Sequence, residues 1–168
     1  MSESEYQAVV RLLPRMRRFA YGLSGSMEAA EDLVQEACAR LLSSAGDKSG
    51  YLDRWLFRTI RNLHVDGLRS QQVSERYRHR LEPPPEGDGH GDDRRAEASL
   101  ELERVRELIG RLPPEQREVL LLIGVEGYSY KECSQLLELP IGTVTSRVAR
   151  ARRQLLRWTT PETKDEES

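Results

Sequence analysis

The chain has 168 residues, with 26 lysine and arginine against 28 aspartate and glutamate residues and a formal net charge of −2. This length suits one or two small domains, and the charge balance excludes a surface that attracts nucleic acid everywhere. No apolar run approaches the length of a membrane span, and the N-terminus lacks a basic-then-apolar signal, so we expect a cytoplasmic protein that neither enters nor crosses a membrane.

Two amphipathic helices are predicted at the N-terminal end. Ser2 and Glu5 have capping-box spacing, and apolar residues recur at largely helical spacing over Val9–Leu23, where Pro14 predicts a kink or a helix restart. After a short break, Ser26 is placed to cap a second helix with the clearest helical periodicity in the chain. Its apolar positions are Ala30, Leu33, Val34, Ala37, Cys38, Leu41 and Leu42.

The opposite side of this second helix is acidic. It carries Asp32, Gln35 and Glu36, preceded by Glu28 and Glu31. Two interpretations fit this face. Acidic helix faces are most often solvated, but the same face can also dock on a basic helix of a partner protein.

A third helix is predicted from about Leu52 to Leu68, after a loop of small and polar residues. Arg58, Arg61 and Asn62 lie on one side of it, and Trp55 lies near its start. Basic and amide groups beside an aromatic ring are typical of a surface that binds single-stranded nucleic acid, because charge holds the backbone and rings stack on unpaired bases. The alternative for Trp55 is a place in the core.

The helical pattern fails from about Gln71 to Arg95. This stretch contains LEPPPEGDGHGDD, with three successive prolines, three glycines and five acids but no lysine or arginine, so it predicts an extended, mobile and acidic linker. The histidines are isolated from one another and from the two distant cysteines, Cys38 and Cys133, so we expect neither a metal site nor a disulfide.

The C-terminal part predicts four more helices. The first runs from about Ala96 to Arg111, and a largely buried one follows Pro114. Ser129 and Glu132 have capping-box spacing at the start of a short third helix, which the Leu139-Pro140 step ends.

The last helix is amphipathic and rich in arginine. It starts near Ile141, and up to Trp158 it contains five arginines and no acidic residue. Two short helices joined by a tight turn, the second basic, are typical of a helix-turn-helix that reads duplex DNA in the major groove. A merely solvated basic helix is the alternative, and the capped first helix and the proline turn favour DNA recognition.

Four segments occur in an order that resembles a known family. They are AEDLVQEACARL (residues 30–41), WLFRTIRNLHVDGLR (55–69), LPPEQREVLLL (112–122) and GYSYKECSQLLELPIGTVTSRVARAR (127–152). The chain resembles a bacterial RNA polymerase sigma factor of the extracytoplasmic-function (ECF) type, in the sigma-70 family. Residues 1–72 would then form region 2, 73–95 a flexible linker, 96–158 region 4 and 159–168 a disordered tail, so that the fold is all-α with two small helical domains.

The resemblance implies a role for each surface. The second helix would dock on the clamp coiled coil of the polymerase β′ subunit, region 4 would meet the β flap, and the third helix would hold the melted non-template strand of the −10 element. The polymerase-binding residues would be Asp32, Gln35 and Glu36. The −10 residues would be Trp55, Arg58, Arg61 and Asn62. The −35 residues would be Thr143, Thr145, Ser146, Arg147, Ala149 and Arg150.

Two of these −35 positions depart from the family pattern. Positions matching Thr145 and Ala149 often carry longer or basic side chains, which implies sparse base readout here and more weight on phosphate contacts and DNA shape.

The resemblance also implies regulation by an anti-sigma factor. The amino-acid sequence of region 2 is similar to that of the general-stress subgroup of the alphaproteobacteria. Two other classes stay open: a stand-alone helix-turn-helix regulator, and a sigma mimic that sequesters an anti-sigma factor. We find no nucleophile–base pair, phosphate loop or ligand cluster, so we expect no enzyme, no cofactor and no small-molecule substrate.

Overall fold

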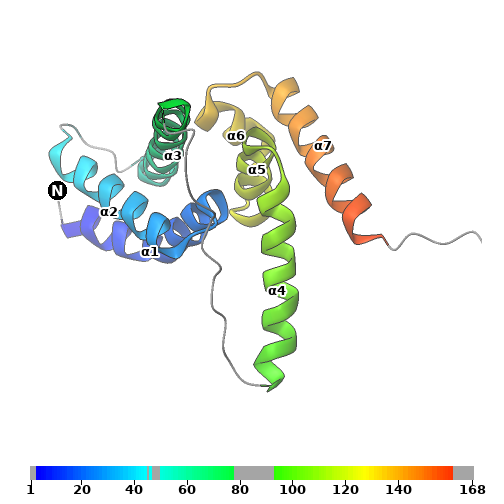
Figure 1. Cartoon of the computed structure of the whole chain (residues 1–168). Coiled ribbons are helices and arrows are strands. Elements are labelled where there is room, and N and C mark those ends of the chain that lie inside the picture. The colour runs from blue at the N-terminus through cyan, green and yellow to red at the C-terminus, as the bar shows by residue number, and fades with distance from the viewer. Residues whose placement is uncertain (1–2, 45, 47–49, 78–92, 161–168) are drawn as a thin grey trace, which may run out of the picture.

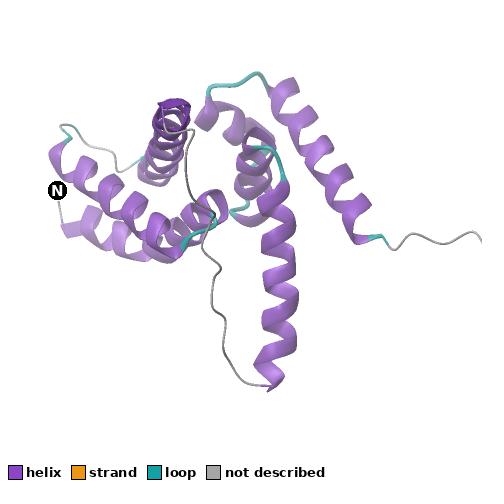
Figure 2. Ribbon diagram, viewed as in Figure 1, coloured by secondary structure: helices purple, strands orange, loops and turns teal. Residues whose placement is uncertain are grey.

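The computed structural model describes residues 3–44, 46, 50–77 and 93–160, and these residues form helices and connecting loops (Figures 1 and 2). The all-α prediction is confirmed. The elements are α1 (Glu3–Ser24), α2 (Met27–Ser43), α3 (Leu52–Tyr77), α4 (Asp93–Arg111), α5 (Pro114–Leu120), the π-helical turn η1 (Leu121–Val125), α6 (Tyr130–Leu137) and α7 (Ile141–Thr159).

The N-terminal half is a bundle of α1, α2 and α3 (Figure 1). Ser26 caps α2 as predicted, because its side chain accepts a hydrogen bond from the Ala29 N–H at 3.3 Å. The bundle has an aliphatic and aromatic interior that follows the predicted stripes. Its buried residues are Val9, Met16, Phe19, Ala20, Leu23, Ala30, Val34, Ala37, Leu52, Leu56, Phe57 and Ile60.

Three expectations for this half need correction. Of the two outcomes predicted at Pro14, the restart is wrong, because α1 runs unbroken through this residue, and the kink stays a prediction. Leu42 belongs to the predicted apolar stripe but is 66% exposed, since it lies in the last turn of α2. Helix α3 continues beyond Leu68 to Tyr77, because the polar residues that follow Leu68 include neither proline nor glycine to break it.

The C-terminal half consists of α4, α5 with η1, α6 and α7. Pro114 opens α5, and η1 extends that helix with wider turns. The predicted turn between α6 and α7 is confirmed: Glu138 takes a left-handed conformation with φ of 55°, and its N–H donates to the Ser134 carbonyl. Helix α7 then begins at Ile141, next to Pro140, as the sequence predicts.

The predicted linker and tail lie partly outside the described residues. Helix α3 includes residues 73–77 and α4 includes residues 93–95, so both helices enter the predicted linker. Residues 78–92 and 161–168, and Ser2 of the first capping box, are not described. Helix α7 ends at Thr159, the first residue of the predicted tail.

The two halves share one hydrophobic core, and in Figure 1 α6 lies next to α3. The Phe57 ring centroid is 5.1 Å from that of Phe19 and 5.7 Å from that of Tyr128, which comes from the C-terminal half. Gly22 of α1 faces Leu121 of η1 so closely that an added Cβ would lie 2.7 Å from a leucine methyl carbon. The halves therefore pack directly on each other.

Replacing Ser129 by alanine is expected to lower the free energy of unfolding by about 1 kcal/mol. Ser129 Oγ accepts a hydrogen bond from the Glu132 N–H at 3.2 Å, and the Ser129 N–H donates to Glu132 Oε2 at 2.9 Å. Urea denaturation measures the change. The control, Ser70→Ala, alters an exposed serine inside α3 and should be neutral or slightly stabilising, since alanine favours helix. Equal effects of the two substitutions would contradict a role for the cap.

Candidate functional site

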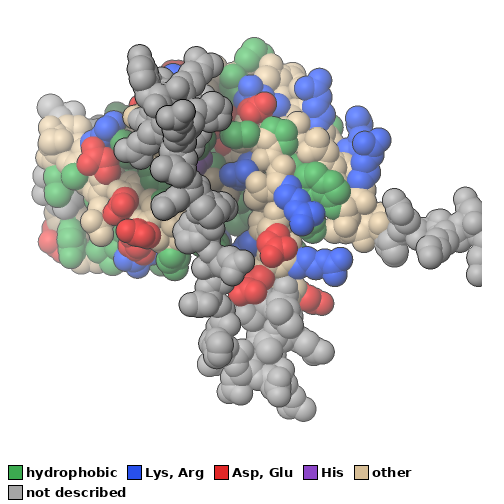
Figure 3. All heavy atoms as spheres, viewed as in Figure 1, with side chains coloured by type: hydrophobic (Ala, Val, Ile, Leu, Met, Phe, Trp, Pro, Cys, Tyr) green, Lys and Arg blue, Asp and Glu red, His purple; other side chains and the backbone are tan. Residues whose placement is uncertain are grey.

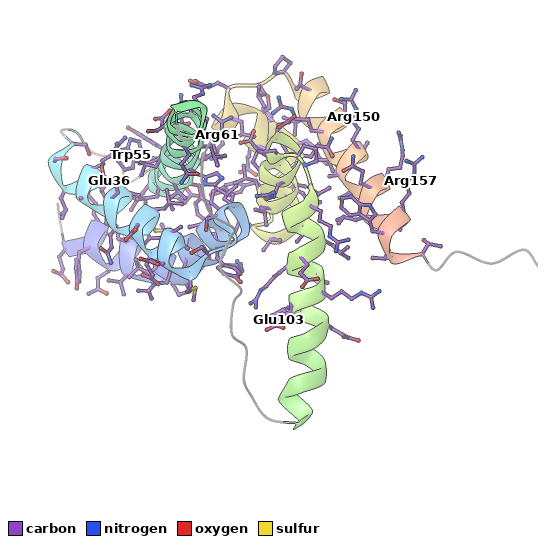
Figure 4. The ribbon with its side chains drawn as sticks, in the orientation of Figure 1. Glu36, Trp55, Arg61, Glu103, Arg150 and Arg157 are labelled. Carbon is purple, nitrogen blue, oxygen red and sulfur yellow. The ribbon has the colours of Figure 1, made fainter. Side chains whose placement is uncertain are left out.

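The acidic face of α2 is open to solvent. Asp32, Gln35 and Glu36 are all exposed, and Glu36 accepts a hydrogen bond along its own helix, from Arg40 Nε at 2.8 Å. Figure 4 shows Glu36 on the side of the molecule far from α7. Because an exposed pair within one helix is weak, these carboxylates remain accessible to a basic partner.

A shallow groove runs beside this face, between α2 and α3. Asp32 and Glu36 line its edge together with Leu33 and Leu63. His64 also lines it, and burial together with the charge of Arg117 lowers the pKa of this histidine, so that it is neutral near pH 7. An apolar floor beside carboxylates suits a partner helix that brings both basic and apolar side chains.

The predicted −10 residues lie on α3, and two of them, Arg58 and Arg61, pair with glutamates of the other half. Arg61 Nε donates to Glu118 Oε2 at 2.7 Å, and Arg58 Nη2 lies 2.5 Å from Glu138 Oε1. Asn62 is exposed and accepts a hydrogen bond from Arg61 Nη1 at 3.3 Å. These arginines therefore face glutamates from α5 and from the end of α6.

Trp55 is half-buried and packs against the core, which favours the interpretation that places it in the core. Its backbone carbonyl accepts from Thr59 Oγ1 at 2.8 Å. Phe57, by contrast, is completely buried.

The last helix, α7, is amphipathic as predicted. Val144, Val148 and Ala151 are buried, while the other faces of the helix are open. Figure 3 shows blue arginine side chains gathered over α7, and Figure 4 shows Arg150 and Arg157 directed away from the body of the protein. The first turns of α7 and its arginines thus form an exposed basic surface that fits a DNA groove.

The six predicted −35 residues differ in accessibility. Thr145, Ser146, Ala149 and Arg150 are exposed, and Thr143 is half-buried. The hydroxyl groups of Thr145 and Ser146 donate hydrogen bonds to backbone carbonyls of α7. Toward DNA, these two hydroxyl groups can therefore act as hydrogen-bond acceptors. Arg147 is half-buried and donates through Nη1 to Glu118 Oε1 at 3.3 Å.

Glu118 brings the two predicted DNA sites together. Its side chain is 5% exposed, and its carboxylate accepts hydrogen bonds from Arg61 of α3 and from Arg147 of α7. A buried carboxylate needs such partners, because an unpaired charge in the protein interior is costly. Sequence reasoning did not single out Glu118, which is the acidic residue of LPPEQREVLLL that falls on the buried side of α5.

A second buried carboxylate was also missed. Glu126 has a side-chain exposure of 0% and accepts from Arg15 Nε and Arg18 Nε, each at 2.9 Å. Nearby, the Tyr128 hydroxyl donates to Asp53 Oδ2 at 2.9 Å. The two residues of each of these pairs lie 75 to 111 residues apart in the sequence, so no local sequence pattern predicts the contacts.

No group of three or more His, Cys, Asp or Glu residues suitable for a metal ion occurs among the described residues. Cys38 and Cys133 are free thiols, and burial, followed by the charge of Glu118, raises the pKa of Cys133 to about 12. Within the same described ranges, every helix is too short or too polar to cross a membrane.

Comparison with known proteins places both halves in one family. Residues 8–73 match sigma-70 region 2, and residues 102–155 match sigma-70 region 4. The ECF RNA polymerase sigma factor EcfG of Rhodopseudomonas palustris is 34% identical over 162 residues, which cover 92% of this chain and 84% of that protein. The chain belongs to the ECF RNA polymerase sigma factors, as the four segments in the sequence predict.

Two further proteins similar to this chain are also sigma factors. The ECF sigma factor SigE of Mycolicibacterium smegmatis is 36% identical over 150 residues, covering 84% of this chain and 56% of that protein. The sigma factor RpoE of Bartonella quintana, solved in complex with the anti-sigma factor NepR, has a TM-score of 0.76 and 28% identity, covering 93% of this chain and 96% of RpoE. One alignment therefore spans both halves.

Proposed function

We propose that this protein is an alternative sigma factor that binds core RNA polymerase and directs it to promoters with −10 and −35 elements. The observation that carries the proposal is the match to sigma regions 2 and 4, in that order, on a chain with an open acidic face on α2 and an open basic face on α7. Such a factor acts in the cytoplasm as a specificity subunit and performs no catalysis of its own.

Each surface has a proposed role. Asp32, Gln35 and Glu36, with the groove beside them, dock on the clamp of the β′ subunit, and region 4 meets the β flap. The face of α3 with Arg58, Arg61 and Asn62 holds the melted −10 strand with Trp55 at its start, where extracting a base from the stack costs a few kcal/mol that contacts must return. The face of α7 with Thr143, Thr145, Ser146, Arg147, Ala149 and Arg150 binds the −35 duplex.

An anti-sigma factor is the proposed regulator. The fold resembles that of RpoE bound to NepR over nearly the whole chain, and EcfG is among the relatives. Both similarities support membership of the general-stress subgroup.

A gel-shift experiment with and without core polymerase tests this function against a stand-alone regulator. The proposal predicts that promoter fragments shift strongly only when the chain and core polymerase are both present. Tight, sequence-specific binding of the chain alone, unchanged by core polymerase, would favour the stand-alone regulator instead.

Replacing Arg150 by alanine is expected to weaken holoenzyme binding by ~1–3 kcal/mol at one position of the −35 element, because Arg150 is the exposed arginine nearest the start of α7. Competition gel shifts with single-base −35 variants measure it. The control, Arg11→Ala, removes an exposed arginine of α1 and should leave this affinity unchanged. A variant that matches the control would remove Arg150 from the DNA interface and would fit a sigma mimic.

A further inference from the structure

One buried carboxylate lies beneath the helix-turn-helix. Glu118 belongs to α5, and its side chain is 5% exposed. Burial and then the charge of Glu118 raise the pKa of the Cys133 thiol to about 12, which places the carboxylate near α6, the first helix of the motif. Its Oε1 atom accepts a hydrogen bond from Arg147 Nη1 of α7 at 3.3 Å. The carboxylate therefore contacts the DNA-facing helix from inside the protein.

Arg147 lies at the edge of the open face of α7. It follows the buried Val144 by three residues and precedes the buried Ala151 by four, so it borders the apolar stripe. Its side chain is 24% exposed, whereas Arg150 is exposed and points away from the protein (Figure 4). A side chain at this edge faces the rim of a DNA groove, where the phosphates lie, while Arg150 faces the base edges on the groove floor.

The hydrogen bond to Glu118 fixes the direction of the Arg147 guanidinium. Nη1 is taken up by the carboxylate. Within the part of the chain that the structure describes, Nε and Nη2 of Arg147 donate to no protein group. These two N–H groups form one edge of the planar guanidinium fork, which matches two oxygens of a phosphate. The buried acid thus leaves a phosphate-binding edge of Arg147 free.

We propose that Glu118 is a positioning residue for promoter binding, which holds Arg147 so that the free edge of its guanidinium binds a DNA phosphate beside the −35 base contacts. This inference rests on the proposed function, since it takes the face of α7 with Arg150 as the −35 surface. An arginine that is already held in its binding geometry loses less conformational freedom when DNA arrives. The two arginines then have different tasks: Arg150 senses the sequence, and Arg147 adds affinity at any sequence.

A double-mutant cycle in reconstituted holoenzyme tests this role. Glu118→Gln keeps the size of the side chain and removes its charge, Arg147→Ala removes the guanidinium, and a third variant carries both substitutions. The probes are promoter fragments that the wild-type holoenzyme selects from genomic DNA, and their single-base −35 variants, with affinity measured by competition gel shifts. Glu115→Gln is the matched control, because it changes an exposed glutamate of the same helix in the same way. Circular dichroism verifies that each variant is folded.

Glu118→Gln is expected to weaken DNA binding by about fivefold, the factor that corresponds to ordering one long side chain at an interface. Arg147→Ala should weaken it at least as much. Both losses should be the same for every −35 variant, because a phosphate contact carries no sequence information. The double variant should bind no more weakly than Arg147→Ala, and Glu115→Gln should bind like the wild type.

The double variant also decides which arginine transmits the effect, because Glu118 Oε2 accepts from Arg61 Nε at 2.7 Å. A fivefold loss from Glu118→Gln that persists without Arg147 would overturn the proposal. Full affinity of Arg147→Ala, or a loss confined to one −35 position, would overturn it too. If Glu118→Gln does not fold, Glu118→Asp decides in the same cycle, since it keeps the charge and shortens the reach towards Arg147. A wild-type holoenzyme that selects no promoter fragment would instead count against the proposed function.

Discussion

Charge reversal of both Asp32 and Glu36 to lysine is expected to weaken binding to core RNA polymerase by at least about thirtyfold and to abolish promoter-dependent transcription. Both carboxylates are exposed on one face of α2 beside the groove that α3 completes. Reversal places like charges against the proposed basic helix of the polymerase. Fold and stability should change little, because Asp32 and Glu36 lie outside the core. Co-migration with core polymerase in gel filtration measures the effect.

The matched control reverses Glu103 and Glu107 on α4. These two glutamates are exposed as well, and the double substitution changes the net charge by the same amount. Figure 4 shows Glu103 on the projecting part of α4, away from Glu36. The control should bind core polymerase like the wild type. Equal loss of binding in the two double variants would mean that overall charge, rather than the α2 face, governs the interaction.

Replacing Phe57 by alanine is expected to lower the free energy of unfolding by about 3–5 kcal/mol. Its ring is fully buried between Phe19 of α1 and Tyr128 of the C-terminal half, so the deletion leaves a cavity where the two halves meet. Since small domains are stable by only about 5–15 kcal/mol, the variant should be close to unfolding at physiological temperature. Guanidinium chloride denaturation of the full chain measures the loss.

Tyr51→Ala supplies the comparison for Phe57. Tyr51 is an aromatic residue just before α3, but it is 49% exposed, so its removal should change the free energy of unfolding by no more than about 0.5 kcal/mol. Similar losses for the two variants would show that Phe57 is not the packing centre of the interface.

Local signals in the sequence predict the helices well. The Ser26 cap and the Ser129–Glu132 capping box fix two helix starts, and the Leu139-Pro140 step fixes the turn before α7. Each of these signals acts through backbone groups within a few residues of it, so a single sequence contains all the information that they need. The periodicity of Val144 and Val148 likewise predicts the buried face of α7.

The contact between the halves has no such local signature. Glu118 and Glu126 look like ordinary surface acids in a charged sequence, and their arginine partners in the N-terminal half lie 57 to 111 residues away. Only the fold shows that each carboxylate is buried and that the arginines of α1 and α3 point at it. The same long-range packing explains why Arg58 and Arg61 of the predicted −10 face pair with glutamates of the C-terminal half, while Asn62 stays exposed.

Transcription in a purified system tests the central claim most directly. The chain is combined with core polymerase from its own organism and genomic DNA fragments, and start sites are mapped genome-wide from the run-off transcripts. The account predicts a defined set of starts, preceded by shared −10 and −35 sequences, that are absent with core polymerase alone. A chain that joins core polymerase yet adds no start site, or one that does not join it at all, would contradict the assignment as a promoter-specificity subunit.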